Sequence, residues 1–114
     1  MSFIGARSAY ILSVYDYKEF EKSLIGEFLS GVVIDDETFR FRSFEQMVTS
    51  QVVTKTMVEG ELEVLTHNGS FYVIDAKHKL FKISLAELKI MRAGSYSPER
   101  ILEIRGHLKT WIKQ

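Results

Sequence analysis

The chain contains no cysteine among its 114 residues. This absence excludes disulfides, thiolate nucleophiles and thiolate metal sites, and it fits a reducing compartment. No apolar run approaches the roughly 18 residues that a membrane-spanning helix needs. The opening residues also lack the charged head and apolar core of a secretory signal. We therefore expect a cytoplasmic protein that has no membrane partner.

Proline and glycine are scarce, with one proline and seven scattered glycines. Flexible linkers are rich in these residues, so the composition leaves no room for a long one. The hydrophobic content of 46% and the charged content of 26% are typical of a folded globular protein. Length and composition together predict a single globular domain over residues 1–114.

The formal net charge is zero, yet the charges are unevenly distributed along the chain. Residues 1–75 contain six Lys and Arg against twelve Asp and Glu, a balance of −6. Residues 76–114 contain nine against three, a balance of +6. Such halves can attract each other inside one fold, join neighbouring copies, or present a basic face to a polyanion. The charge pattern thus indicates where a partner would bind without choosing among these uses.

The first third of the chain predicts a strand followed by a helix. Residues 9–15 are apolar and rich in β-formers, which is typical of a strand. Asp16 and Glu19 match a capping box, and Gly31 suits a helix C-terminus, so we expect a helix over residues 17–29. Its apolar side chains recur at helical spacing and are Phe20, Leu24, Ile25 and Phe28.

Two short strands are expected on either side of an acidic turn at residues 35–37. They cover residues 32–34 and 38–42. A capping-box pattern that begins at Ser43 predicts a second helix from near Phe44. Valine and threonine become dense after Gln51, so we expect the chain to change there from helix to strand.

The clearest local signal is a β-hairpin. Residues 61–67 and 70–75 resemble strands and flank Asn68-Gly69, which tolerates the positive φ angles of a type I′ turn. Glu59-Gly60 predicts a similar tight turn before the hairpin. Residues 80–84 predict a further antiparallel strand after it, which would complete a meander.

Two capping signals mark the C-terminal part of the chain. Ser84 and Glu87 predict a short helix or turn that ends near Gly94, although residues 88–91 could instead form a strand. The run Ser97-Pro98-Glu99 is a strong start for a last helix. The apolar stripe of that helix comprises Ile101, Ile104, Leu108, Trp111 and Ile112.

These elements together predict an α+β fold. We expect an antiparallel meander sheet of about five strands, packed by an N-terminal helix and a C-terminal amphipathic helix. Both predicted helices carry an apolar stripe, and such a stripe must be buried against a sheet or against another helix.

Basic residues of the C-terminal half supply the first candidate binding site. Part of the set aligns on one side of the last helix, and the rest occupies a loop tip. The members are Lys77, His78, Lys79, Arg105, Lys109 and Lys113. Phosphates could bind such a set. The solvated face of an amphipathic helix explains the same residues, and the zero net charge favours that explanation.

Interleaved aromatic and basic residues in the predicted strand at 38–42 are a second candidate: Phe39, Arg40, Phe41 and Arg42. Single-stranded nucleic acids stack on such aromatic rings, but any half-buried strand shows the same alternation. The three histidines lack metal-binding spacing, and no catalytic motif is present. We therefore expect no catalytic residue, no metal and no cofactor.

Two classes of function remain open, and no family resemblance narrows the choice. The first is a small non-enzymatic interaction module that acts through protein–protein contacts and self-associates as a homo-oligomer. The second is a small nucleic-acid-binding regulator that uses the basic C-terminal helix. An enzyme of unknown class comes third, because no residue can be assigned to catalysis.

Overall fold

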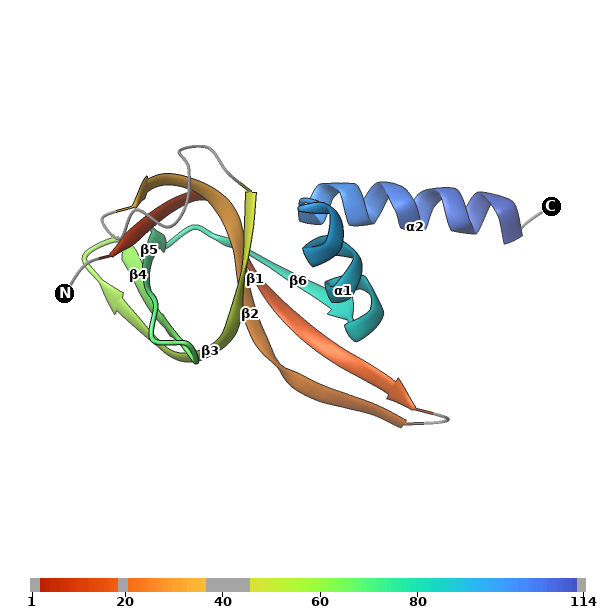
Figure 1. Cartoon of the computed structure of the whole chain (residues 1–114), viewed down its shortest axis with the longest axis horizontal. Helices are drawn as coiled ribbons and strands as arrows, with labels where there is room; N and C mark the ends of the chain where they lie inside the picture. The colour runs from red at the N-terminus through yellow and green to blue at the C-terminus, as the bar shows by residue number, and fades with distance from the viewer. Residues whose placement is uncertain (1–2, 19–20, 37–45, 113–114) are drawn as a thin grey trace.

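A computed structural model describes residues 3–18, 21–36 and 46–112, with all of their side chains except those of residues 18, 35–36 and 107–112. Figure 1 shows a barrel of strands with two helices beside it. The strands are β1 Ile4–Lys18, β2 Glu21–Asp36, β3 Gln46–Val58, β4 Glu61–Thr66, β5 Phe71–Asp75 and β6 Lys79–Ser84. The helices are α1 Leu85–Gly94 and α2 Pro98–Ile112.

Strands β1 to β5 form a closed barrel, because β1 pairs with β2 on one side and with β5 on the other. Consecutive strands pair antiparallel around the ring. Five strands connected in this way must close with one parallel pair, and β5 runs parallel to the start of β1 at Ile4–Tyr72 and Gly5–Val73. Strand β6 lies outside the ring and pairs parallel with residues 10–15 of β1.

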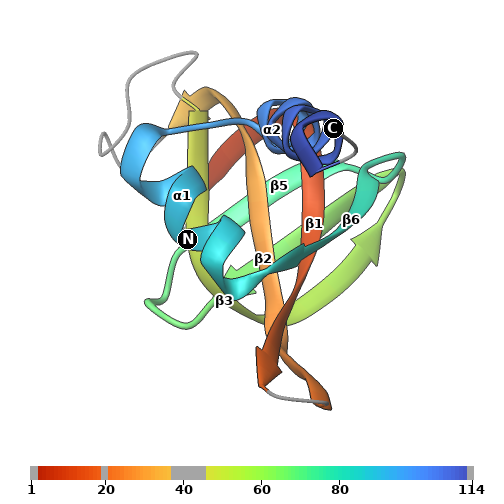
Figure 2. The same cartoon turned by 90° about the vertical axis from the view of Figure 1, so that its right-hand side faces the viewer.

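Strand β1 contributes to two hydrophobic cores, one on each of its faces. Successive side chains of a strand point to opposite faces, so Ile11 enters the barrel while Tyr10 and Leu12 face the helices. The barrel core consists of Ile4, Ala6, Ala9, Ile11, Leu29, Val33, Met47, Leu62, Val64, Tyr72 and Ile74. The second core consists of Tyr10, Leu12, Val14, Phe28, Ile83, Leu88, Met91 and Ile101. Figure 2 shows the helices in front of the sheet that β6, β1 and β2 form.

The helix predicted over residues 17–29 is wrong, because residues 21–36 form β2 and pair antiparallel with β1. Leu24 and Phe28 share the spacing of a helical stripe, but Leu24 is exposed whereas Phe28 is buried against α1 and α2. Gly26 weakens a helix at this place, and pairing with β1 stabilises the extended chain instead. The predicted α+β sheet with an N-terminal helix is therefore replaced by a β-barrel with two C-terminal helices.

The helix predicted between Phe44 and Gln51 is also wrong, whereas the strand predicted after Gln51 is confirmed. Residues 46–58 form one strand, β3, so the chain before Gln51 is not helical where the structure describes it. Met47 and Thr49 are both buried, which is the period of two that a strand shows. Residue 44 and the strand predicted at 38–42 lie outside the described residues.

Strand β6 does not reverse on β5, so the sheet is not a simple meander. Both strands run parallel to β1, one after the other, along the same side of it. Between them the chain steps outward at residues 76–78. The step is held by a 3.1 Å hydrogen bond from the His78 N–H to the Asp75 carbonyl and by a 2.8 Å bond from the Lys77 N–H to the Asp75 carboxylate.

The predictions for the C-terminal helices are confirmed in their main points. The capping box of α1 forms, with the Glu87 N–H donating to Ser84 Oγ at 3.1 Å and the Ser84 N–H donating to Glu87 Oε1 at 2.8 Å. Helix α2 begins at Pro98 as expected, and Ile101 in its stripe is buried. The side chains of residues 108, 111 and 112 lie outside the described set. Neither helix, as far as the structure describes them, has the length and apolar character to cross a membrane.

The two predicted turns both form, and only the turn at Asn68-Gly69 differs in type from the prediction. Gly69 has a φ of +86°, as predicted, yet the loop between β4 and β5 has three residues, because the Thr66 N–H donates to the Ser70 carbonyl. A type I turn followed by a left-handed glycine is the usual form of such a loop. Glu59 and Gly60 have φ angles of +43° and +83°, and they form a two-residue type I′ turn, as predicted.

Candidate functional site

Beyond the barrel, β1 and β2 continue as a projecting two-stranded hairpin (Figure 1). Strand β3 pairs with β2 only from Phe28–Gln51 to Val32–Gln46. Residues 21–27 of β2 consequently have no strand on their outer edge within the described structure. A strand edge of this kind presents backbone N–H and C=O groups that another strand can pair with.

One face of this hairpin carries two tyrosines and a lysine. Tyr15 and Tyr17 lie two residues apart in β1 and therefore point to the same side. The Lys22 ammonium lies 4.2 Å from the ring centroid of Tyr15 and 5.9 Å from that of Tyr17. Leu24 pairs with Tyr15 across the strands, and it is 58% exposed, while Tyr17 is 60% exposed. We name these four residues the hairpin surface.

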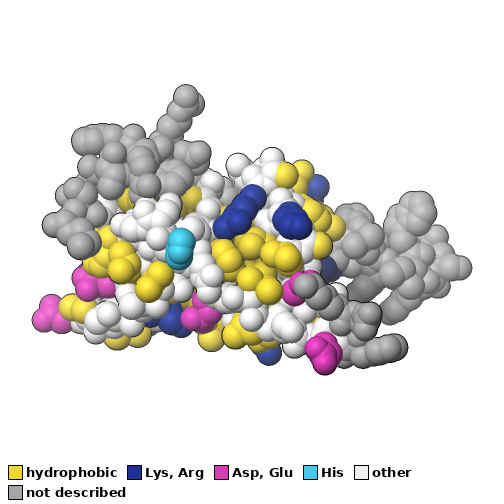
Figure 3. All heavy atoms as spheres, turned by 60° about the horizontal axis from the view of Figure 1, so that its bottom comes forward, with side chains coloured by type: hydrophobic (Ala, Val, Ile, Leu, Met, Phe, Trp, Pro, Cys, Tyr) yellow, Lys and Arg dark blue, Asp and Glu magenta, His cyan; other side chains and the backbone are white. Residues whose placement is uncertain are grey.

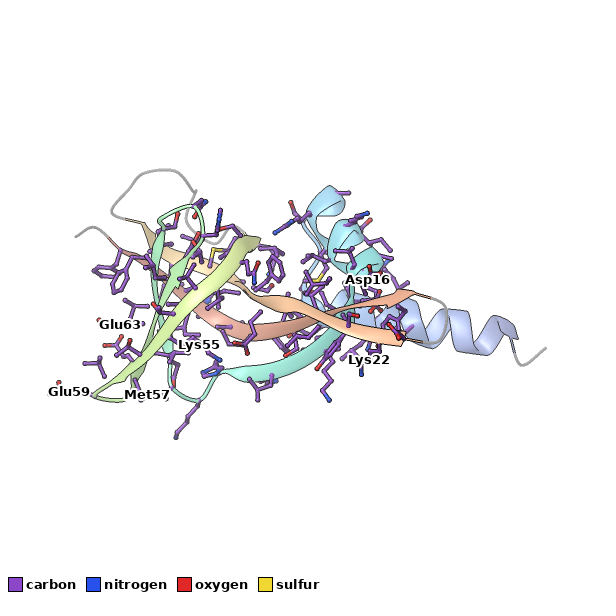
Figure 4. All side chains as sticks on the ribbon, turned by 90° about the horizontal axis from the view of Figure 1, so that it is seen from below. Asp16, Lys22, Lys55, Met57, Glu59 and Glu63 are labelled. Atoms are coloured by element: carbon purple, nitrogen blue, oxygen red, sulfur yellow. The ribbon has the colours of Figure 1, made fainter. Side chains whose placement is uncertain are left out.

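The point where β2 and β3 separate is closed by polar contacts. The Lys55 ammonium forms an ion pair with the Glu27 carboxylate at 2.9 Å. The Gln51 side-chain amide donates to the Ile25 carbonyl at 3.5 Å. Figure 4 shows Lys22 at the hairpin end of the molecule and Lys55 nearer the barrel. On the face of the molecule that Figure 3 shows, hydrophobic side chains form patches that are bordered by lysine, arginine, aspartate and glutamate side chains. The outer edge of β2 is therefore open only toward the tip of the hairpin.

A pocket of about 290 Å³ lies where β1 and the β5–β6 path move apart. On one side of β1, Arg7 pairs with Val32 and Tyr10 pairs with Ser30, so an extra residue bulges out between them. Ser8 in this bulge has a φ of +50°, which a serine seldom adopts. On the other side of β1 the chain leaves β5 and rejoins at β6. The bulge and the outward step together open the pocket.

The pocket is lined by charged groups from several elements. Arg7 comes from β1, Lys77 from the segment between β5 and β6, Lys79 from the start of β6, and Glu99 from the first turn of α2. Asp75 completes the charged set, and its carboxylate already accepts the Lys77 N–H. A neighbouring pocket of about 440 Å³ shares Ala6, Arg7, Ser8 and Asp75 with the first and opens beside the barrel.

Tyr10, which is buried, and Glu99, which is exposed, form one wall of the pocket. The Tyr10 hydroxyl donates to Glu99 Oε1 at 2.6 Å. This hydrogen bond, assisted by burial, raises the pKa of Tyr10 to about 12. Burial raises the pKa of Glu99, but the Tyr10 hydrogen bond and other donors outweigh it, so the pKa of Glu99 is lowered overall. At neutral pH the pair is therefore a neutral phenol donating to a carboxylate.

The structure separates the basic residues that the sequence predicted as one set. Lys77, His78 and Lys79 line the pocket. Arg105 instead contacts Glu87 of α1 through its Nε at 2.5 Å, and it donates through Nη2 to the Lys82 carbonyl at 2.9 Å. The side chain of residue 109, residue 113 and residues 39–42 lie outside the described structure, so their predicted roles remain predictions.

Several pocket residues were not predicted from the sequence: Arg7, Ser8, Tyr10 and Glu99. No spacing pattern marks them, because the pocket arises from a bulge in one strand and a break between two others. A serine with positive φ gives no signal in a sequence, and Glu99 was interpreted only as part of a helix start.

No family model, no curated protein and no solved structure matches this chain significantly. Over the part of the chain that the structure describes, no group of three or more histidines, aspartates and glutamates is arranged to hold a metal ion. The interpretation of function therefore depends on the geometry of the hairpin and the pocket.

Proposed function

We propose that the protein is a small non-enzymatic interaction module that acts through protein–protein contacts, and that its partner is a second copy of the chain. The observation that carries the proposal is the projecting hairpin, which combines an open strand edge with exposed Tyr17 and Leu24. Open strand edges bind other strands through backbone hydrogen bonds. Aromatic residues are enriched at interfaces.

The open part of the β2 edge can pair with its own copy about a two-fold axis. In such a contact residue i of one copy faces residue j of the other, and j faces i. When two copies pair antiparallel about Ser23, Leu24 of each copy faces Lys22 of the other, in the part of the edge that lies beyond the Gln51 and Lys55 contacts. The aliphatic stem of a lysine can cover an apolar side chain, which stabilises such a pair.

Size-exclusion chromatography with light scattering tests this proposal. We expect wild-type protein to have twice the monomer mass. Leu24→Arg should yield the monomer without lowering the unfolding midpoint, because Leu24 is exposed in the single chain. Leu102→Arg is the matched control, because Leu102 is 51% exposed and belongs to α2, outside the hairpin. Wild-type protein that stays monomeric at the highest attainable concentration would refute the proposal.

The same measurement, repeated with a DNA or RNA pool, tests the alternative of a nucleic-acid-binding regulator. A complex that weakens steeply with salt would support that alternative. Arg105 argues against it, because its guanidinium is engaged with Glu87 and with the Lys82 carbonyl. The basic C-terminal helix thus has one cation fewer to offer to phosphates than the sequence indicated.

A further inference from the structure

The pocket between β1 and the segment that joins β5 to β6 is built into the fold. Ser8 holds a left-handed conformation that costs free energy and persists only where the surroundings enforce it. Gly31 lies across from it in β2, and a Cβ at that position would lie 3.2 Å from the Arg7 carbonyl oxygen. Strained residues of this kind gather at ligand sites, so the conformation of Ser8 suggests that this pocket binds a ligand.

Two lysines of the pocket, Lys77 and Lys79, are less satisfied than its carboxylates. Asp75 accepts the Lys77 N–H, and Glu99 accepts the Tyr10 hydroxyl. The Lys77 ammonium and the Ser8 hydroxyl have no hydrogen-bond or ion-pair partner among the described residues. The Lys79 ammonium lies 5.7 Å from the ring centroid of Tyr10. It forms no ion pair within the described residues, although its charge helps to lower the pKa of Glu99. The pocket therefore has donors to offer and few free acceptors, which favours an anion.

From this arrangement we propose that the pocket binds a small soluble phosphate monoester, with its phosphate held by Lys77, Lys79 and the Ser8 hydroxyl. Lysine ammonium groups bind phosphate as point charges, and a hydroxyl adds a directed donor. The volume of about 290 Å³ lies at the lower end of small-molecule pockets, which limits the ligand to about the size of one ring. Ala6, Ala9 and Tyr10 supply an apolar wall for its carbon part.

The site is independent of the proposed self-association. The hairpin surface consists of Tyr15, Tyr17, Lys22 and Leu24, whereas the part of β1 that lines the pocket is residues 6–10. The Leu24→Arg variant can therefore be used as a background in which binding is measured without a change in oligomeric state. Failure of one proposal then leaves the other intact.

Phenyl phosphate is a suitable probe, and amide chemical shifts in an NMR titration at constant ionic strength give the readout. We expect saturable shifts at residues 6–10 and 75–79. Lys77→Gln and Lys79→Gln should each weaken the affinity on the order of tenfold, which is the usual effect of losing a charge-assisted hydrogen bond. Lys89→Gln, which removes an exposed lysine of α1, should leave the affinity unchanged.

Three outcomes would overturn the proposal. The first is an absence of shifts at these amides at millimolar phenyl phosphate. The second is equal weakening by Lys89→Gln, which would mean that attraction is unspecific. The third is co-sedimentation with phosphatidic acid vesicles while phenyl phosphate leaves the pocket amides unmoved, which would assign the lysines to a membrane headgroup. Phenol, which lacks the phosphate, should cause no saturable shift.

Discussion

At the scale of single residues, Tyr10 connects the barrel to the C-terminal helix. Its ring belongs to the core between the sheet and the helices, and its hydroxyl donates to Glu99 in the first turn of α2. The ring also lies 6.2 Å from that of Phe81 in a tilted arrangement. One side chain thus joins β1, β6 and α2 by burial and by a charge-assisted hydrogen bond.

Replacing Tyr10 with Phe removes this hydrogen bond and keeps the ring. Because the acceptor is a carboxylate, we expect the free energy of unfolding to fall by about 1–3 kcal/mol. Urea denaturation at neutral pH measures the change. Tyr96→Phe is the matched control, since Tyr96 is exposed, and it should leave the midpoint unchanged. Equal midpoints for the two variants would contradict the role assigned to Tyr10.

The raised pKa of Tyr10 predicts a loss of stability at alkaline pH. The folded protein holds the phenolic proton up to a pKa of about 12, whereas the ordinary value is 10.0. The contribution is therefore fully present below about pH 10 and disappears as the pH rises toward 12. The stability difference between wild type and Tyr10→Phe should shrink over this interval. A difference that stays constant up to pH 12 would show that the hydroxyl is not held as described.

Gly69 tests backbone strain without side-chain clashes. A Cβ at Gly69 would meet no atom within 4 Å, yet its φ of +86° is unfavourable for a β-branched residue. Gly69→Val should therefore cost about 1–2 kcal/mol, measured by chemical denaturation. Gly106 in α2 is the control, because it is equally open and has no positive φ. Gly106→Val should cost nothing, and an equal loss in both variants would refute the turn assignment.

At the scale of elements, the sequence predicts those that depend on local signals. The capping box of Ser84 and Glu87, the start of α2 at Pro98 and the hairpin around Gly69 all form. Each is stabilised by hydrogen bonds or backbone preferences within a few residues. The predictions for strand β2 and for the direction of β6 were wrong, because both are determined by pairing with β1. For β6, this partner is distant in the sequence. Tertiary pairing overrides local propensity in both cases.

The same distinction applies to the candidate site. Lys77 and Lys79 could be selected from the sequence, because they lie in a basic loop. Arg7 and Glu99 could not be selected in this way, since they line the same pocket only because β1 bulges and α2 packs beside it. Arg105 was expected on a solvated face, but its side chain is only 33% exposed and lies over the Phe81 ring. Charge patterns locate the cations, whereas the fold decides which ones remain unpaired.

Arg105 and Glu87 form the contact that holds α2 against α1 and β6. Arg105→Gln should lower the free energy of unfolding by about 1 kcal/mol, a value between those of exposed pairs and of hydrogen bonds to buried charges. Arg100→Gln is the control, because Arg100 pairs with Glu103 at a more exposed site on the same helix. Its cost should stay below about 0.5 kcal/mol. Chemical denaturation of both variants measures these free energies, and equal losses in the two variants would contradict the role assigned to Arg105.

This contact also predicts a dependence on acid. Burial raises the pKa of Glu87, but the hydrogen bonds from Arg105 and Ser84 outweigh it, so the pKa lies below the ordinary 4.5. The contribution is therefore present above about pH 4.5 and disappears as the pH falls through the folded pKa. The gap in stability between wild type and Arg105→Gln should narrow over that interval. If this difference in the free energy of unfolding instead widened as the pH falls, Glu87 would not be the residue through which Arg105 stabilises the protein.

At the scale of the whole molecule, the central feature is that β1 belongs to both cores. Ile11 is fully buried in the barrel, and Leu12 is fully buried beneath the helices. Neither core can come apart without freeing one face of the same strand. The barrel and the helical side should therefore unfold together, as small single domains usually do.

Native-state hydrogen exchange tests this coupling. Ile11→Ala removes buried atoms from the barrel alone, and such changes cost about 2–5 kcal/mol in a packed core. If the two cores unfold as one unit, the most protected amides of α1, which Ile11 does not help to bury, should lose as much protection as those of β4. The reverse change, Leu88→Ala in α1, should lower protection in β4 equally. Loss of protection confined to the mutated side would mean that the helices form a separate unit, in which case β1 serves as a wall for two independent cores.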